Sequence, residues 1–191
     1  MRTVTATAFI SLDGVVEAPG GEAGYRNSGW TVNGIDFDEA AYEIKGREQA
    51  EATAMLMGRL SYQSFAAVWP GMTAEFAAYN AMPKFVVSTT LQEDDLVSDW
   101  GDTTILRGIR DVEKLKEGDG GPLIIHGSAT LVRDLTDAGL VDRYHLLVFP
   151  LLLGAGTRLF GDTDKATQQL ALIESEAYSN GIQKLVYDVV R

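Results

Sequence analysis

The segment from Pro122 to Phe160 constrains the fold more than any other part of the chain. It opens with an apolar run, residues 122–125, of the kind found in strands that are covered on both faces. The turn His126-Gly127-Ser128 follows this run. Ser128 is predicted to cap the next helix, because its hydroxyl can accept a hydrogen bond from a backbone N–H group.

The remainder of this segment predicts a helix and a central strand. Gly139 suits the left-handed end of the helix, and residues 144–153 are apolar enough for the strand. Four apolar residues at helical spacing should form the buried face of the helix: Leu131, Val132, Leu135 and Ala138. A strand that leads through a glycine turn into a helix places N–H groups and the helix dipole where they can hold a phosphate.

Strands and helices alternate through the first two thirds of the chain. Further strands are predicted at residues 3–10, 54–57, 84–88 and 103–106, and helices at residues 36–51, 60–69, 73–81 and 111–117. Two later strands, 168–176 and 182–190, are joined by the hairpin signal Ser179-Asn180-Gly181. The pattern predicts a single α/β domain over residues 1–191, with a mostly parallel sheet and antiparallel C-terminal edge strands.

Several local features follow from this assignment. Asp36 is predicted to cap the helix 36–51, and Thr73 the helix 73–81. Residues 17–35 form a long loop whose one large apolar residue, Trp30, is either a packing anchor or a cover for a ligand. Other apolar residues are expected to face the core: Phe37, Ala40, Ala41 and Ile44 in the first helix, and Leu170, Leu172 and Ile173 in the penultimate strand.

Composition excludes several classes of function. The net charge of −11, from 16 basic and 27 acidic residues, argues against nucleic acid and anionic membranes as partners. The absence of cysteine excludes disulfides, thiolate metal sites and a cysteine nucleophile, and it favours a cytoplasmic location. We expect no membrane span and no signal peptide, because the first residues alternate as in a strand. The acidic segment 92–102 lacks the spacing of a calcium loop, so no metal site is predicted.

Four predicted strands end in residues of similar chemical character. These ends hold small residues, hydroxyls, a helix start or an arginine: Ser11-Leu12-Asp13-Gly14, Gly58-Arg59 with Ser61, Ser88-Thr89-Thr90, and Gly127-Ser128. In open α/β sheets, ligands bind beyond the carboxyl ends of the strands. The four ends together therefore predict a groove for a dinucleotide. Neither the Rossmann fingerprint nor a Walker motif occurs, so the groove is of another type.

These motifs resemble the dihydrofolate reductase-like family. In particular, the chain is similar to the reductase domain of bacterial riboflavin biosynthesis, the RibD C-terminal type, in a stand-alone form. The matching pieces occur in the expected order: SLDG at 11–14, MGRLSYQSF at 57–65, VSTTL at 87–91, and the long run at 127–160. The resemblance implies a three-layer dihydrofolate reductase-like fold with a mostly parallel central sheet.

The resemblance also implies that NADPH is the cofactor. Arg59 would supply charge for the adenosine 2′-phosphate, since its fork matches phosphate oxygens. His126 stands where the family has a glycine. The residues implied to bind the cofactor are Gly58, Arg59, Ser61, Ser88, Thr89, Thr90, His126, Gly127, Ser128 and Ala129.

The implied reaction is a direct hydride transfer to a small heterocyclic substrate, with the protein positioning the reactants and excluding water. Asp13 is the candidate proton donor; alternatively it only shapes the Leu-Asp-Gly turn. The substrate side is expected to include Trp30, Asp38, Pro150, Leu153, Gly154 and Phe160, several of which serve equally well in capping or packing.

Three activities stay open at this point. The first is reduction of a phosphorylated ribosylaminopyrimidine, as in 5-amino-6-(5-phosphoribosylamino)uracil reductase. Its phosphate would need basic residues, for which Arg26, Arg107, Arg110 and Arg158 are loose candidates. The second is dihydrofolate reduction, and the third is a non-catalytic nucleotide-binding module. A homodimer is also expected, because the C-terminal strands offer more apolar surface than one small helix layer covers.

Overall fold

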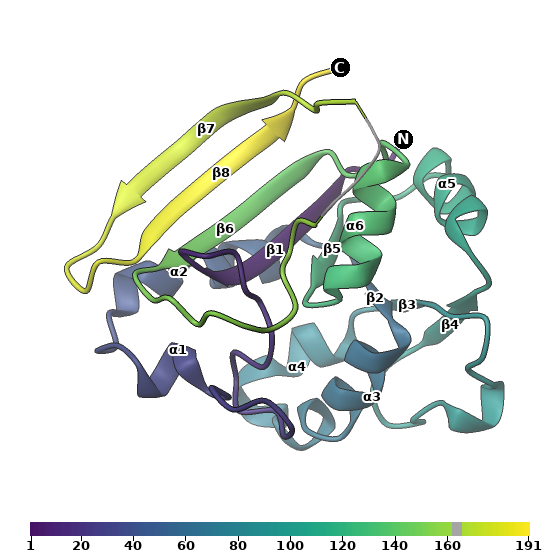
Figure 1. The fold of residues 1–191 in the computed structure, drawn as a ribbon. Helices are drawn as coiled ribbons and strands as arrows, with labels where there is room; N and C mark the ends of the chain where they lie inside the picture. Colours follow the sequence, from purple (N-terminus) through teal and green to yellow (C-terminus); the bar gives the residue numbers. More distant parts are fainter. Residues whose placement is uncertain (162–165) are drawn as a thin grey trace.

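An eight-stranded sheet runs through the protein, with strand order β4-β3-β2-β5-β1-β6-β8-β7 (Figure 1). The computed structural model describes residues 1–161 and 166–191, without the side chains of residues 73–75. The strands are β1 (Val4–Ser11), β2 (Ala54–Gly58), β3 (Lys84–Val87), β4 (Thr103–Leu106), β5 (Leu123–His126), β6 (Arg143–Phe149), β7 (Leu170–Ala177) and β8 (Gln183–Val189).

The predicted strand directions are confirmed. Every pairing from β4 across to β6 is parallel, whereas β8 pairs antiparallel with both β6 and β7. The hairpin turn between β7 and β8 contains Gly181 at φ 86°, in the left-handed region that glycine favours. Because β1, β2, β3 and β5 are parallel neighbours, their carboxyl ends lie along the same edge of the sheet.

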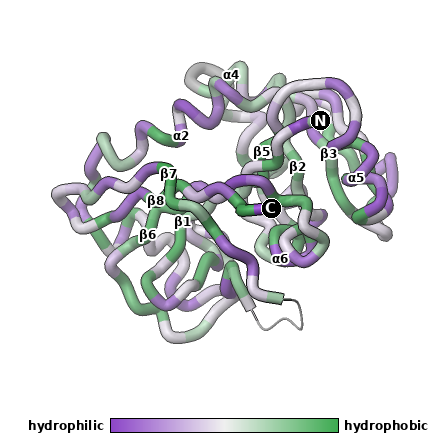
Figure 2. Tube along the Cα trace, turned by 90° about the horizontal axis from the view of Figure 1, so that it is seen from above, coloured by the Kyte–Doolittle hydropathy of each residue, from purple (hydrophilic) through white to green (hydrophobic). Residues whose placement is uncertain are grey.

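Helices cover both faces of the sheet and produce the expected three-layer α/β fold (Figures 1 and 2). On one face lie α2 (Glu39–Glu51), α3 (Arg59–Ala66) and α4 (Thr73–Ala81); on the other lie α5 (Ile109–Glu117) and α6 (Ala129–Asp137). Short helical turns complete the set: α1 (Trp30–Asn33), η1 (Trp69–Gly71) and η2 (Glu93–Asp95).

Alternation along the strands divides the core between the two faces. Val4, Ala6 and Ile125 pack in the cluster beneath α6, whereas Met55 and Ile124 face α3 and α4. The central strands contribute side chains to both clusters because each face carries helices. Figure 2 shows that hydrophobic residues gather in these strands.

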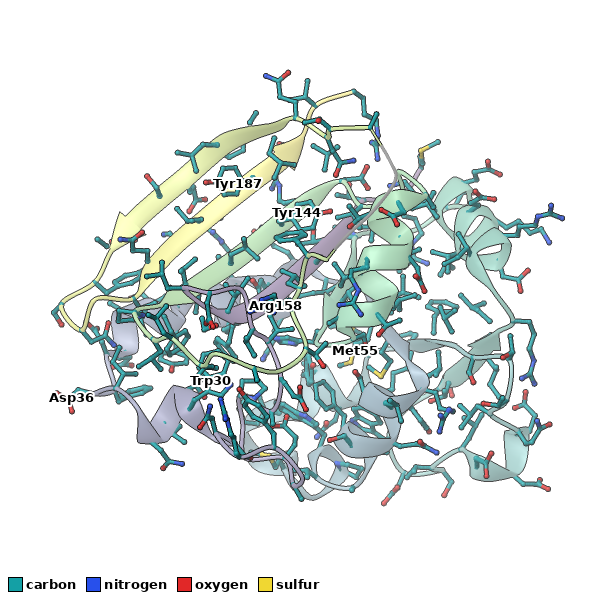
Figure 3. The ribbon with its side chains drawn as sticks, in the orientation of Figure 1. Trp30, Asp36, Met55, Tyr144, Arg158 and Tyr187 are labelled. Atoms are coloured by element: carbon teal, nitrogen blue, oxygen red, sulfur yellow. The ribbon has the colours of Figure 1, made fainter. Side chains whose placement is uncertain are left out.

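The start of α2 differs from the prediction. Asp38, not Asp36, is its N-cap, with a side-chain oxygen that accepts a hydrogen bond from the Ala40 N–H group at 3.2 Å. Figure 3 shows Asp36 pointing away from the body of the protein. Phe37, which precedes the helix, and Ala40 are exposed and not inward as predicted, while Ala41 and Ile44 are buried. The predicted cap of α4 was also wrong, since that helix begins at Thr73 and its N-cap is Met72.

The outer face of β7 corrects another prediction. Leu170, Leu172 and Ile173 are 36%, 53% and 50% exposed, instead of facing the core. The alternating pattern identified the strand correctly, but no described element of this chain covers its apolar side chains. In α6, Leu131, Val132 and Leu135 are buried as predicted, whereas Ala138 is an exposed C-cap residue.

The described residues contain neither a membrane-spanning helix nor a cluster of metal-binding side chains. None of their helices has the length and apolar character needed to cross a membrane. Within the same residues, no group of three or more histidine, aspartate or glutamate side chains is arranged to hold a metal ion. The acidic segment 92–102 contains only the short turn η2, whose residues Gln92 and Asp95 cap each other's backbone.

Candidate functional site

A cavity of about 540 Å³ lies at the carboxyl ends of four parallel strands. Ala8 and Phe9 of β1, Gly58 of β2 and Val87 of β3 line it, together with Gly127, which follows β5. The predicted meeting of these strand ends is therefore observed. Its volume lies within the roughly 300–1,000 Å³ that is usual for small-molecule sites.

Two helix N-termini form one wall of the cavity. α3 begins directly after Gly58 and α6 directly after Ser128, and residues of both first turns line the space: Arg59, Leu60, Ser61, Ala129, Thr130 and Leu131. The first N–H groups of a helix have no partner within the helix, and the helix dipole makes this end positive. The wall is therefore suited to bind an anion such as a phosphate.

Ser128 joins these two helix starts instead of capping its own helix. It adopts a left-handed conformation, with φ 57° and ψ 46°, and makes no side-chain cap bond. Its hydroxyl oxygen accepts a hydrogen bond from the Gly58 N–H group at 2.9 Å. The predicted cap was wrong because a serine in this conformation directs its hydroxyl toward β2. The bond fixes the relative positions of the two N-termini.

Gly127 keeps the cavity open beside this contact. Its φ of +67° lies in the region that glycine favours. A Cβ atom placed there would lie 3.5 Å from the Ser61 hydroxyl and 3.8 Å from the Phe65 ring. A side chain at this position would therefore occupy space between the two helix starts.

Charge is distributed unevenly around the cavity. Arg59 lines it and donates to the Gln63 side-chain oxygen at 3.0 Å. Glu17, Glu22 and Asp134 also line it. The Glu17 carboxylate accepts hydrogen bonds from the backbone and hydroxyl of Thr157 at 2.7 and 3.0 Å. The helix starts and Arg59 are thus positive, Glu17 and Glu22 make the loop after β1 acidic, and Asp134 adds a carboxylate from α6.

The Ser88-Thr89-Thr90 loop lies next to the cavity but does not line it, although its neighbour Val87 does. The Ser88 hydroxyl accepts hydrogen bonds from the N–H groups of Thr90 and Leu91 at 3.2 and 2.9 Å. Arg107 donates to the carbonyls of Ser88 and Leu91 at 3.2 and 2.7 Å. The loop is therefore held in place, with Thr89 and Thr90 exposed.

His126 points away from the cavity. Alternation along β5 directs its side chain toward α4, where Nδ1 lies 3.0 Å from the Tyr79 hydroxyl. Burial and the Lys45 charge lower the pKa of His126 to about 4, against an opposing effect of Glu48. The imidazole is therefore neutral at pH 7, and the residue reaches the cavity only through its neighbour Gly127.

Asp13 also lies outside the cavity lining, where it joins two loops. Its carboxylate accepts hydrogen bonds from the Ser11 hydroxyl at 2.7 Å and from the N–H groups of Leu153 and Gly154 at 3.1 and 2.8 Å. The Ser11 bond, helped by the two backbone bonds and opposed by burial, lowers the pKa of Asp13 to about 2. An ionised carboxylate accepts protons, so this geometry does not suit a proton donor.

We expect Asp13→Asn to reduce stability at pH 7 but not at strongly acidic pH. The folded-state pKa of about 2 lies below the ordinary value of 3.8, so the carboxylate stabilises the fold above about pH 4 and loses this effect as the pH falls toward 2. Urea unfolding of both proteins at pH 7, 4 and about 2.5 measures the difference. A difference that does not change with pH would contradict this role.

A family model for the RibD C-terminal domain matches residues 2–184. The chain belongs to this family. A curated relative, the uncharacterised protein YyaP of Bacillus subtilis (strain 168), is 26% identical over 97% of this chain and 94% of its own length. Membership confirms the resemblance inferred from the motifs. The family match spans almost the whole chain.

Solved structures share this RibD C-terminal fold. A putative riboflavin biosynthesis protein from Shewanella sp. PV-4 aligns with a TM-score of 0.77 at 19% identity, over 99% of both chains. A pyrimidine reductase-like protein from Corynebacterium diphtheriae aligns with a TM-score of 0.60 at 14% identity, over 99% of this chain and 92% of that one. Acinetobacter baumannii RibD aligns with a TM-score of 0.65 at 14% identity, and there the match covers 59% of the longer chain.

The residues predicted for the substrate side of this domain do not line the cavity: Trp30, Asp38, Pro150, Leu153, Gly154 and Phe160. Trp30, labelled in Figure 3, is buried. It donates its indole N–H to the Glu17 carbonyl at 2.8 Å and packs edge-on against Phe149. The packing-anchor alternative therefore describes its contacts. Leu153 is part of the same core, and Phe160 is 44% exposed beside Tyr144.

Several lining residues were missed by sequence reasoning. Val16 and Leu159 are brought together by backbone bonds, from Val16 N–H to the Thr157 carbonyl and from Leu159 N–H to the Gly14 carbonyl. Residues 14–16 and 157–159 are far apart in sequence, and no local sequence pattern predicts that they pair. Phe9 lies in the predicted strand 3–10, but whether a strand residue lines a cavity depends on the tertiary fold.

Proposed function

We propose that this protein is an NADPH-dependent reductase that transfers a hydride to a small heterocycle of the pyrimidine or pteridine type. The observation that carries the proposal is the pair of helix N-termini, joined by the Gly58–Ser128 hydrogen bond, in a cavity at the carboxyl ends of parallel strands. Membership in the RibD C-terminal domain family supports it.

The lining residues fit the parts of NADPH. Ser61, Gly127, Ser128 and Ala129 offer backbone and hydroxyl donors for the diphosphate, and Gly58, whose N–H group is bonded to Ser128, allows its close approach. Among the other lining residues, the apolar side chains of Ala8, Phe9, Val16 and Leu159 suit a flat ring. The cavity of about 540 Å³ between these residues leaves room for NADPH.

The adenosine 2′-phosphate would lie near Arg59 and the Ser88-Thr89-Thr90 loop. Arg59 lines the cavity, and the exposed hydroxyls of Thr89 and Thr90 add donors. Arg107 holds this loop through two carbonyls, and therefore positions it. We include Arg107 in the cofactor site as a positioning residue.

Bound NADPH would supply the hydride, and the protein supplies the environment. The lining binds and orients both reactants, and the apolar ring end excludes water. No covalent nucleophile is needed. Asp13 keeps the loops after β1 and β6 together instead of donating a proton, because it is ionised at neutral pH.

We further propose that the hydride acceptor carries no phosphate group. Arg26 and Arg158, candidates for such a phosphate, donate to the carbonyls of Leu153 and Asp13, each at 3.1 Å. Glu17 and Glu22 line the cavity and would repel a second phosphate. This favours an unphosphorylated heterocycle over the phosphoribosylamino substrate of the riboflavin pathway.

A panel of pyrimidines and pteridines, each with and without a ribose phosphate, tests both proposals through the loss of NADPH absorbance. We expect turnover with an unphosphorylated member, and a much lower kcat/KM with its phosphorylated counterpart. A preference for the phosphorylated members would overturn the substrate proposal only. NADPH binding without turnover of any member would favour the non-catalytic nucleotide-binding module instead.

We also propose that two copies of the chain associate through the outer face of β7. Leu172→Glu should then yield a monomer, because it places a charge among Leu170 and Ile173 at an exposed sheet edge. Light scattering should give about twice 20.7 kDa for the wild type and 20.7 kDa for the variant. Leu152→Glu is the matched control, since Leu152 is 75% exposed but follows β6. A wild-type mass of 20.7 kDa at high concentration would refute the dimer.

A further inference from the structure

Four polar side chains are buried between α2 and the sheet, behind the cavity. Thr7, Lys45, Glu48 and His145 are between 1% and 9% exposed. Ion pairs in such positions are rarely more stabilising than apolar residues of similar size, because desolvation offsets their attraction. Their presence here therefore calls for a role other than stability, and the proposed reaction leaves them unused.

Their contacts keep the charges in one arrangement. The Glu48 carboxylate accepts a hydrogen bond from the Thr7 hydroxyl at 2.8 Å and lies 2.9 Å from His145 Nδ1. The Lys45 ammonium lies 3.3 Å from the other Glu48 oxygen and also donates to the Thr7 hydroxyl. Burial opposes ionisation of Glu48, but the Lys45 charge and the bonds from His145 and Thr7 prevail and lower its pKa to about 2. Burial also lowers the pKa of Lys45, and the charge of Glu48 and the hydrogen bond to it oppose this shift. Glu48 is therefore ionised, and its carboxylate stabilises the ammonium form of Lys45.

The positive end of this pair points toward the cavity. Tyr42, Lys45 and Glu48 follow one another at intervals of three along α2, so they share a face of the helix. The Tyr42 ring lies 5.8 Å from the Phe9 ring, and the Lys45 ammonium lies over Phe9 at 4.9 Å. Glu48 is one turn further on, beside Thr7 and His145. Because Phe9 lines the cavity, the ammonium lies between the cavity end and the carboxylate.

We propose that the Lys45–Glu48 pair is an internal dipole that makes the cavity prefer the reduced over the oxidised cofactor. The inference rests on the proposed function, with the nicotinamide ring at the apolar end that contains Phe9. That ring carries a positive charge only when it is oxidised. An ammonium behind Phe9 repels this charge, and the surrounding protein screens it less than water does. Release of the oxidised cofactor is favoured as a result.

Isothermal titration of NADPH and NADP⁺ tests the dipole without any substrate. The double variant Lys45→Met/Glu48→Gln removes both charges and leaves no unpaired ion, so it is expected to fold. We expect the ratio of Kd for NADP⁺ to Kd for NADPH to fall by roughly three- to tenfold. If the double variant does not fold, Lys45→Gln/Glu48→Gln also removes both charges, keeps hydrogen-bonding groups beside Thr7 and His145, and carries the same expectation.

The pair Lys116–Asp142 provides the matched control. Lys116 and Asp142 form a second largely buried ion pair, which contacts the backbone of Arg2 and Val4 at the amino end of β1. Lys116→Met/Asp142→Asn should leave the ratio of the two Kd values unchanged. The dipole is refuted if the ratio is unchanged or rises in the Lys45 variants while both cofactor forms still bind. If the wild type binds neither form, the proposed function itself falls, and this inference with it.

Discussion

Replacing Gly127 with valine is expected to abolish measurable NADPH binding. The side chain would project between the two helix starts, next to the Ser61 hydroxyl, where the diphosphate is proposed to bind. It would also strain the backbone at φ +67°, at a cost of about 1–2 kcal/mol or more in the free energy of unfolding. Titration calorimetry with NADPH measures the first effect, and urea unfolding the second.

Gly139→Val separates these two effects. Gly139 has nearly the same φ, +69°, but lies just beyond the other end of α6, with no atom within 4 Å of an added Cβ. It should therefore lose a similar amount of stability and keep full NADPH affinity. Equal loss of affinity in both variants would show that backbone strain, and not a side chain in the cavity, causes the loss of NADPH binding. Unchanged affinity in Gly127→Val would place the cofactor elsewhere.

Arg59→Ala is expected to weaken NADPH binding about 10- to 100-fold while changing NADH binding little. A charge-assisted hydrogen bond contributes about 1.5–3 kcal/mol, and only NADPH has the 2′-phosphate that Arg59 is proposed to meet. The Arg59 guanidinium otherwise bonds to Gln63, a contact within α3 that the fold can lose at small cost.

Affinities of both dinucleotides for the wild type and the variant give the result directly. NADH serves as the internal control, because any general damage to α3 would weaken both dinucleotides alike. An equal loss for NADH and NADPH would assign Arg59 a structural role. No loss for either would remove it from the site.

Sequence reasoning predicted the sheet well, because apolar runs or alternating apolar residues indicate its strands and glycines indicate several of its turns. It also predicted that Gly58 and Gly127 lie at strand ends that share one groove, since parallel strands align their carboxyl ends. The motifs of the RibD C-terminal family added the cofactor expectation, which local patterns alone do not give.

Side-chain direction was harder to predict. Ser128 follows a strand and precedes a helix, as a cap does, but its left-handed backbone turns the hydroxyl to Gly58 instead. His126 belongs to the turn motif, yet strand alternation directs it to Tyr79. Asp13 meets Leu153 and Gly154 only because two loops 140 residues apart in sequence meet in the fold. Each of these outcomes depends on tertiary contacts that a single sequence does not display.

The exposed face of β7 is a different kind of failure. Leu172 and Ile173 are apolar like core residues, and the sequence alone does not tell that no described part of this chain covers them. The burial of Lys45 and Glu48 could not be predicted either, because charged residues in a helix usually indicate a face exposed to solvent.

The central claim is that the cavity between the starts of α3 and α6 holds NADPH. A titration of the ¹⁵N-labelled protein with NADPH tests it most directly, by following the backbone amide signals of the two first turns and of Gly127. The account predicts saturable binding of one NADPH per chain, with the largest shifts at Ser61, Gly127 and Thr130. Absence of saturation at millimolar NADPH, or shifts confined to other parts of the protein, would contradict it.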